Sequence, residues 1–436
     1  MRAFRPPKII LLLIVLVAIV LRVAYVAWNW SRHPAVIGYE ADNLAISLLA
    51  GKGFSSPFGV ASCPSAWLTP VYPLIVAVIF KLFGPYSNLS RGVQVGLNEL
   101  FSALTCIPIF LIGTRIGGRR LAVTASLLWA IFPIAQLVPL IALWYTSLSA
   151  FLMAWTVWGT MAVLDSQRYR DWIGYGLLWG LGIMTNAAVF SIVPFFLAWL
   201  ILVRYRPLRS LHSAWMPFIA LVTIAVSCAP WTVRNYIAFG KLVPFRSNFG
   251  AELWYYNIPV AKHPSLDTSE RALFGKMGER AYTQDRGDRA TRWVLTLAQT
   301  NPPGLLRNLG NRFVGMWIGD AHPLNDISKN GFNSAVDLLL CSLAIAGLVM
   351  LARCSHEYFW LFISALFAFP LVYYLTTASD IYRHPIDPLL IVLSAYPLSY
   401  LFSSPRKSAL LAGAEKRARE LRTVKASALA GRSSNV

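Results

Sequence analysis

Apolar runs recur along nearly the whole chain, and short polar turns that contain arginine separate most of them. A helix needs about 20 mostly apolar residues to cross the hydrocarbon core of a bilayer. The run 172–203 is too long for one such helix and contains a polar Thr185-Asn186 step, so we expect two short helices there. The pattern predicts an all-α polytopic membrane protein with about ten spans. The expected spans are about 9–28, 93–113, 121–140, 144–164, two within 172–203, 216–233, 335–352, 357–376 and 386–402.

Two polar segments interrupt this pattern. The first, 29–91, holds a short amphipathic helix that ends at Gly51 and Gly53, followed by an apolar patch of about 14 residues. That patch is too short for a comfortable span and predicts an interfacial or re-entrant helix. The second polar segment, 234–334, contains no apolar run long enough to span a membrane, and its pattern predicts loop helices. The expected organisation is a transmembrane module 1–233 that carries the outer loop 29–91, an extracytoplasmic segment 234–334, transmembrane helices 335–403 and a basic tail 404–436.

The composition and the charge pattern support a membrane protein and set its topology. Of the 436 residues, 56% are hydrophobic and 13% are charged, about half the charged share of a soluble domain. The net charge of +20 does not indicate nucleic-acid binding, because the basic residues lie at the ends of apolar runs and in the tail. Arginines in these places follow the positive-inside rule. With about ten spans, that rule puts both termini in the cytoplasm and both polar segments on the opposite face.

The polar residues on that opposite face suggest a chemistry. Two carboxylates, Glu40 and Asp42, lie in the first polar segment, and arginines follow near the ends of later apolar runs. A carboxylate can act as a general base, and arginine binds phosphate through paired hydrogen bonds. This combination favours a lipid-phosphate substrate, while a capping or ion-pairing role stays open for Glu40, and a helix-start role for His384. The candidates are Glu40 and Asp42 for catalysis, Arg234, Arg246, Arg383 and His384 for a lipid phosphate, and Tyr39, Tyr72, Tyr236, Asn248, Glu252 and Tyr382 for a substrate pocket.

Several short motifs occur in a family-like order. An acidic residue precedes an A-x-x-L-x-x-G-x-G-F motif at Ala45–Phe54, and P-x-Y-P-L at Pro70–Leu74 and K-L-F-G at Lys81–Gly84 follow. A PW-x-x-RNY turn occupies Pro230–Tyr236, and RHPI occupies Arg383–Ile386. With these motifs the chain resembles bacterial glycosyltransferases of the GT-C fold, relatives of the protein O-mannosyltransferases and of the lipid A aminoarabinose transferase.

The resemblance implies a GT-C-like helical bundle that transfers a sugar, with inversion, from a polyprenyl-phosphate donor on the non-cytoplasmic face. It also implies a catalytic acid in the first outer loop. In this sequence that acid is Glu40 or Asp42, and the position in the motif favours Glu40.

The predicted function is therefore an integral membrane glycosyltransferase, expected in a bacterial inner membrane. Its expected partners are a polyprenyl-phosphate sugar, membrane lipids and a lipid, glycan or protein acceptor, without nucleic acid. No cofactor is indicated with certainty, and a divalent metal ion stays open. A lipid or glycan transporter or flippase is the alternative, but the chain shows no internal repeat and its charges lie at the ends of the expected spans. A structural membrane subunit is a third possibility.

Overall fold

The computed structural model describes residues 8–30, 39–60, 63–141, 143–204, 211–258, 268–319 and 327–401. The expected basic tail 404–436 lies outside these ranges. The described residues form helices, turns and one isolated β-bridge between Ser55 and Pro64. The helices of the first half are α1 (Lys8–Asn29), α2 (Glu40–Leu49), α3 (Val71–Phe83), α4 (Asn88–Leu104), α5 (Cys106–Ile131), α6 (Pro133–Ile141), α7 (Thr146–Val163), α8 (Tyr169–Thr185), η1 (Ala187–Ile192) and α9 (Val193–Arg204).

The second half begins with the longest described helix, which contains two prolines. Its helices are α10 (Leu211–Phe239), α11 (Phe249–Asn257), α12 (Thr268–Met277), α13 (Glu279–Thr300), α14 (Pro302–Ile318), α15 (Ile327–Cys354), α16 (His356–Ala368), α17 (Leu371–Leu375), α18 (Asp380–Arg383), η2 (His384–Ile386) and α19 (Asp387–Leu401).

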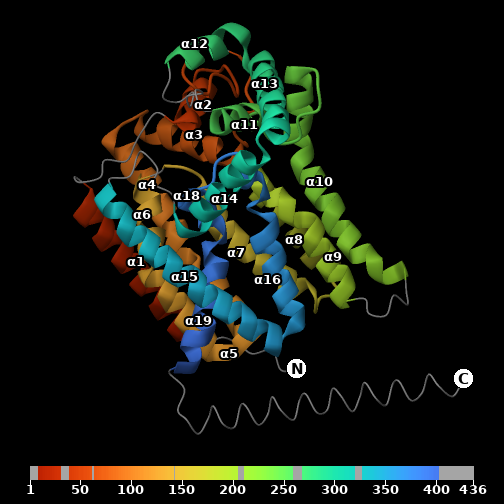
Figure 1. Ribbon diagram of the computed structural model, residues 1–436. Coiled ribbons are helices and arrows are strands. Elements are labelled where there is room, and N and C mark those ends of the chain that lie inside the picture. The colour runs from red at the N-terminus through yellow and green to blue at the C-terminus, as the bar shows by residue number, and fades with distance from the viewer. Residues whose placement is uncertain are drawn as a thin grey trace, which may run out of the picture.

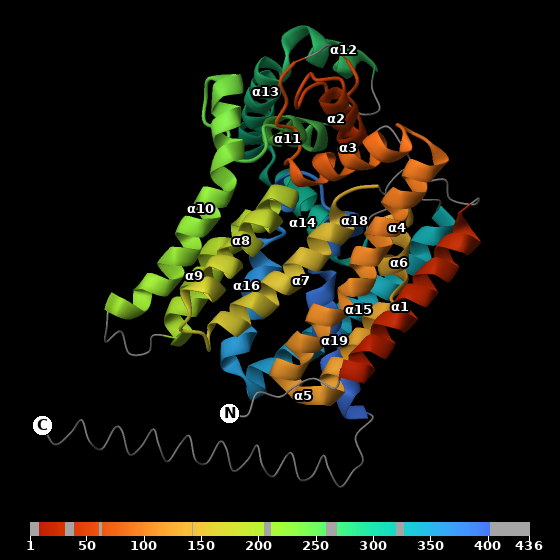
Figure 2. The same ribbon diagram turned by 180° about the vertical axis from the view of Figure 1, so that it is seen from behind.

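The helices form a long bundle and a cap at one of its ends (Figure 1). We call α2, α3, α11, α12 and α13, with their connecting residues, the cap. The reverse view shows the same division, with α14 and α18 between cap and bundle (Figure 2). The two polar segments of the sequence thus lie together at one end of the bundle. They share an apolar core in which the Phe58 ring lies 4.9 Å from the rings of both Trp67 and Phe274.

In the part of the chain that the structure describes, six helical stretches are long and apolar enough to cross a membrane by length and composition, and one of them, Asn88–Ile131, joins α4 and α5. This finding supports an all-α integral membrane protein, but the expected number of ten spans is not confirmed. The break expected at Thr185-Asn186 is present, because α8 ends at Thr185 and the side chain of Asn186 caps η1. The short patch of the first polar segment forms α3, a helix of 13 residues in the cap. The helix α2 ends before Gly51 and Gly53, whose φ angles are +71° and +66°.

The turns at the other end of the bundle are tied to one another. Arg115 Nη2 lies 2.6 Å from a carboxylate oxygen of Asp165, and its Nε donates to the hydroxyl of Tyr358 at 2.8 Å. Arg115 belongs to α5 and Tyr358 to α16, while Asp165 follows the end of α7. These contacts join three elements at the end of the bundle away from the cap.

The expectation that charges lie at span ends is wrong for Arg22 and Glu99, which lie within the expected spans 9–28 and 93–113, while a second buried cluster lies at span ends. Arg22 of α1 lies 3.6 Å from Glu99 of α4 and also donates to the hydroxyl of Ser102. Arg383 lies 2.5 Å from Asp337 and 2.8 Å from Asp387, and all three side chains are fully buried. Buried charges of this kind persist where ion pairs and hydrogen bonds replace water. Apolar runs conceal such residues, because a single charge barely changes the mean hydropathy of a 20-residue window.

The helices α15 and α19 pack closely at Gly347. A Cβ atom at this glycine would lie 1.9 Å from the carbonyl oxygen of Leu393 on α19. A backbone atom cannot move aside as a side chain can, so the two helices would have to separate. Small residues at such crossings allow close packing between membrane helices.

We predict that Gly347→Ala lowers the free energy of unfolding by about 1–3 kcal/mol, the usual cost of overpacking. Thermal unfolding of the detergent-purified protein measures the effect. Gly174→Ala is the matched control, because a Cβ there meets nothing within 4 Å and alanine favours a helix. Equal melting temperatures for the two variants would contradict the prediction.

Candidate functional site

The two acidic residues of the first polar segment point in different directions. Both lie in the first turn of α2. Side chains two positions apart on an α-helix differ in direction by about 200° around the helix axis. Glu40 is half-buried and interacts electrostatically with Arg246 and Arg271 of the second polar segment. Asp42 is almost fully buried, and its charge acts on Tyr39, as that of Glu40 does, and on Tyr72 and Tyr86. Glu40 is therefore the carboxylate that meets the second polar segment.

A second carboxylate and an arginine complete the charged part of the site. Glu252 of α11 accepts a hydrogen bond from Asn248 Nδ2 at 2.9 Å and interacts with both Arg246 and Glu40. Arg246 donates from Nε to the carbonyl of Trp67 at 2.7 Å and from Nη1 to the hydroxyl of Tyr145 at 3.2 Å. Its Nη2 donates to no residue in the described ranges. The sequence predicted Glu40, Arg246, Asn248 and Glu252 as site residues, and the fold brings these four together.

Burial and charge shift the acidity of both carboxyls. The pKa of Glu252 is raised to about 7. Burial is the largest cause, the negative charge of Glu40 contributes to the rise, and the positive charge of Arg246 opposes it. Burial likewise raises the pKa of Glu40, against a backbone hydrogen bond and the charges of Arg246 and Arg271. Carboxyls whose pKa values are raised by burial and nearby charges are a frequent feature of catalytic sites.

Aromatic rings line the same region. The ring centroid of Tyr39 lies 5.1 Å from that of Trp144, which lies 6.1 Å from Tyr382. Tyr382 stacks on Tyr373 at 5.3 Å and hydrogen-bonds with Tyr256. Most of these rings are half-buried, so the charged cluster has a partly accessible aromatic wall. The structure thus adds Tyr39 and Tyr382 to the four site residues above.

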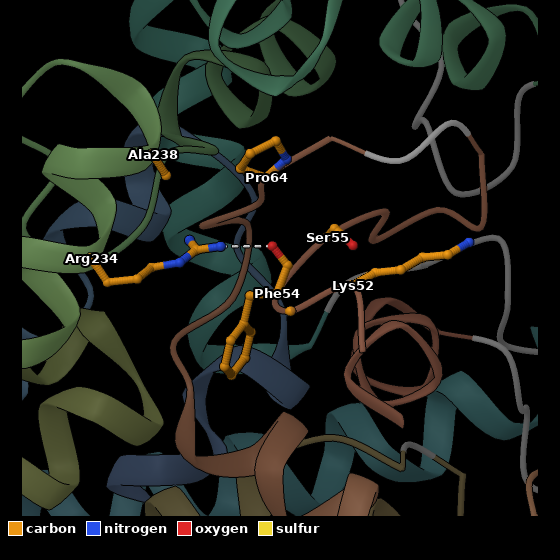
Figure 3. Close-up of a pocket in the computed structure, with 7 residues that line it drawn as sticks. Lys52, Phe54, Ser55, Pro64, Arg234 and Ala238 are labelled. Atoms are coloured by element: carbon orange, nitrogen blue, oxygen red, sulfur yellow. Dashed lines mark hydrogen bonds between the residues drawn. The ribbon is translucent and has the colours of Figure 1, made fainter. Parts of the chain in front are cut away.

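The remaining predicted site residues lie elsewhere. Tyr72 is buried and exchanges hydrogen bonds with Asn98, while Tyr236 is 58% exposed on α10. Arg383 and His384 are fully buried and both contact Asp387, so this geometry does not favour them as phosphate ligands. Arg234 borders a separate pocket (Figure 3).

Sequence reasoning missed several residues that shape this site. Trp144 and Tyr145 occupy an uncharged turn before α7, and Tyr256 closes the Trp254-Tyr255-Tyr256 run. Aromatic residues on the predicted outer face were the available signal, but aromatics are common at membrane interfaces.

Glu279 was also missed. This buried carboxylate accepts from the Ala66 N–H at 2.6 Å and from the hydroxyl of Ser247, and so joins the two polar segments.

The fit of a metal ion can be tested from the side chains. Within the described ranges, no group of three or more His, Cys, Asp or Glu residues is placed to hold a metal ion. Arg246 also interacts with both Glu40 and Glu252. We therefore assign no step to a divalent ion.

Comparisons with known proteins agree with this fold. Residues 67–233 match the sequence family described as dolichyl-phosphate-mannose-protein mannosyltransferase. No curated protein sequence matches the chain. The oligosaccharyltransferase of Archaeoglobus fulgidus in its apo form is similar in structure, with a TM-score of 0.56 and 14% identity over 93% of this chain and 51% of that one.

Two further structures of that enzyme match in the same way. The complex with Zn and sulfate has a TM-score of 0.55 and 13% identity, over 90% of this chain and 49% of that one. The complex of the oligosaccharyltransferase AglB from Archaeoglobus fulgidus with an inhibitory peptide and a dolichol-phosphate has a TM-score of 0.53 and 14% identity, over 94% of this chain and 51% of that one. The chain spans about half the length of these structures. The predicted resemblance to GT-C membrane glycosyltransferases is confirmed at the level of the fold.

The raised pKa of Glu252 has a consequence for stability. The ordinary pKa of a glutamate is near 4.3, and that of Glu252 in the folded protein is about 7. At pH values between these two, the Glu252 carboxyl is protonated in the folded protein and ionised in the unfolded chain. The contribution of Glu252 to the free energy of unfolding therefore falls as pH rises through this range. We predict that Glu252→Gln raises the melting temperature relative to wild type more at pH 8 than at pH 5. Glu357→Gln, at an exposed site of α16, is the control. A difference that is the same at both pH values would refute the assignment.

Proposed function

We propose that the protein is an integral membrane glycosyltransferase that moves a sugar from a polyprenyl-phosphate donor to an acceptor at the capped, extracytoplasmic end of the bundle. The observation that carries this proposal is the convergence of Glu40, Arg246 and Glu252 in one partly accessible, aromatic-lined site. The family matched by residues 67–233, and the dolichol-phosphate in one structure of similar fold, support the donor class.

In the proposed reaction Glu40 is the general base. The acceptor oxygen forms a bond to the anomeric carbon while the bond from that carbon to the phosphate oxygen breaks. The bonding electrons leave with the phosphate, and the acceptor proton passes to Glu40. Because the acceptor attacks opposite the leaving phosphate, the configuration at the anomeric carbon inverts. A base whose pKa is raised toward neutrality accepts a proton efficiently near neutral pH.

The neighbouring residues have distinct roles in this proposal. Arg246 stabilises the phosphate that gathers charge as it leaves, and its Nη2 is available for a phosphate oxygen. Glu252 lies beside Arg246 and the base, and the charge of Glu40 contributes to the raised pKa of Glu252, so Glu252 is largely protonated while Glu40 ionises. The rings of Tyr39, Trp144 and Tyr382 contact the sugar.

The topology that we propose follows from the positive-inside rule. The first turn of α1 and the last turn of α19 lie at the end of the bundle opposite the cap (Figure 2). In this topology the cap is extracytoplasmic, and the first turn of α1 and the last turn of α19 are cytoplasmic, as expected for a bacterial inner-membrane protein. The buried charges Arg22 and Glu99 are a feature that a transporter would also show, and the assay below separates the two functions.

We predict that Glu40→Gln lowers sugar transfer roughly 10²–10⁴-fold, the usual contribution of a general base. Asp42→Asn is the matched control and retains most of the activity, because Glu40 is the carboxylate whose charge interacts with Arg246 and Glu252. The assay follows consumption of radiolabelled polyprenyl-phosphate sugars by the protein in liposomes. Loss only in Asp42→Asn would move the base to Asp42, while full transfer in both variants, or none by wild type, would refute the proposal.

A second prediction concerns the pH dependence of transfer. The rate rises with pH as Glu40 ionises and then reaches a plateau. Glu40 ionises first of the two, because its negative charge contributes to holding the pKa of Glu252 at about 7, so Glu252 is still neutral while Glu40 loses its proton. Glu252→Gln, which is also neutral, should therefore leave the midpoint of the kcat/KM profile unchanged, and the profile of each protein measures that midpoint. A midpoint that moves to lower pH in the variant would show that a charge on Glu252 sets the pKa of the base.

A further inference from the structure

A pocket of about 500 Å³ lies between the loop after α2 and the end of α10 nearest the cap. Figure 3 shows Arg234 entering from α10 on one side and Ser55 and Lys52 from the loop on the other. This pocket is distinct from the site around Glu40. The carboxylate that acts on Arg234 is Glu279, whereas Glu40 and Glu252 interact with Arg246.

Arg234 presents an incompletely satisfied cation to this pocket. Its Nη1 donates to the carbonyl of Ser65 at 2.6 Å and to Asn235 Oδ1 at 3.0 Å, and its Nη2 donates to the carbonyl of Phe54 at 2.7 Å. A guanidinium has five N–H groups, so two of them donate to no residue in the described part of the chain. Among the described residues, no carboxylate oxygen lies within 4.0 Å of Arg234 to form an ion pair. A half-buried arginine in this situation attracts an anion.

A buried hydroxyl provides an independent indication of a ligand. Ser55 lines the pocket and is 2% exposed, and its Oγ has no hydrogen-bond partner among the described residues. Buried polar groups are normally satisfied, so this hydroxyl lacks an expected partner. An oxyanion in the pocket could accept hydrogen bonds from both Ser55 and Arg234. Lys52 is exposed at the rim and adds a second positive charge.

The position of the pocket indicates the source of that oxyanion. Arg234 and Ala238 line it from the last turns of the candidate span Trp215–Phe239. On the adjacent strip of the same helix, Val233 is 56% exposed and Ile237 is 78% exposed. Exposed apolar residues on a spanning helix face acyl chains. The pocket therefore adjoins a lipid-facing surface near the end of a span, where phospholipid headgroups lie.

We propose that this pocket binds the phosphate headgroup of an anionic lipid, with the acyl chains along the exposed face of α10. The phosphate oxygens accept hydrogen bonds from Arg234 and Ser55, and Lys52 contributes charge at the rim. This lipid is additional to the proposed sugar donor, whose phosphate must lie beside Glu40 and Arg246. The site therefore does not depend on the proposed function.

The test measures lipid affinity rather than turnover. Native mass spectrometry of the detergent-purified protein, titrated with phosphatidylglycerol or phosphatidylcholine, gives the dissociation constant of the first bound lipid. We expect phosphatidylglycerol to bind roughly tenfold more tightly, because the choline ammonium of phosphatidylcholine is repelled by Arg234 and Lys52 and offsets the charge of its phosphate. Arg234→Gln should remove this preference, while Arg292→Gln, which removes one exposed positive charge on α13, should leave it unchanged. Equal affinity of wild type for the two lipids would overturn the proposal.

Arg234→Gln removes hydrogen bonds to the carbonyls of Phe54 and Ser65 and could disturb the loop that contains them. Ser55→Ala is therefore a second variant that tests the site without removing these bonds. The Ser55 hydroxyl makes no hydrogen bond to the described residues, so its loss should not disturb the fold. We expect Ser55→Ala to weaken phosphatidylglycerol binding about three- to tenfold. Affinity equal to that of Arg292→Gln would contradict the site. Competition by soluble glycerol phosphate at concentrations similar to the lipid would overturn the assignment to a lipid.

Discussion

The hydrogen bonds of the short segment Ser65–Trp67 hold the cap in place. Its middle amide donates to Glu279 at 2.6 Å, and its middle carbonyl accepts from the amide of Ser247 at 3.0 Å. Its first and last carbonyls accept from Arg234 and Arg246. Two protein donors on Oε1 of the buried Glu279 replace part of the water that this carboxylate loses. This one extended segment therefore joins the first polar segment to residues more than 160 positions later in the chain.

The geometry of the acidic site follows from this join. Arg246 is held by the last carbonyl of that segment, and Glu40 lies at the start of α2, which shares the core of the cap. With both carboxylates ionised, Glu40, Glu252 and Arg246 carry one net negative charge in a partly buried space. Such a group cannot be solvated as in water, so small changes in the surroundings move the pKa values of both carboxyls. Site residues held by a rigid cap suit a reaction that depends on exact placement.

Arg246 and Arg234 have separate environments. Arg246 meets two carboxylates, while Arg234 meets backbone carbonyls and a pocket beside the membrane-facing side of α10. An arginine near a phosphate-handling site is easily assigned to the substrate from sequence, although its charge can serve a second lipid just as well. Arg383 illustrates a third environment, because two buried aspartates neutralise it within the bundle.

The sequence by itself determined the helical membrane architecture, the break at Asn186, the helix α3 and the shared end of the two polar segments. These features depend on local hydrophobicity, run length and flanking charge, which can be read along the chain. Only the tertiary structure decided that Glu40 rather than Asp42 meets Arg246, and that Arg383 lies buried. A helix pattern shows which residues share a face but not what that face meets. The partners Trp144 and Tyr256 come from distant segments, and only the folded chain brings them to Glu40.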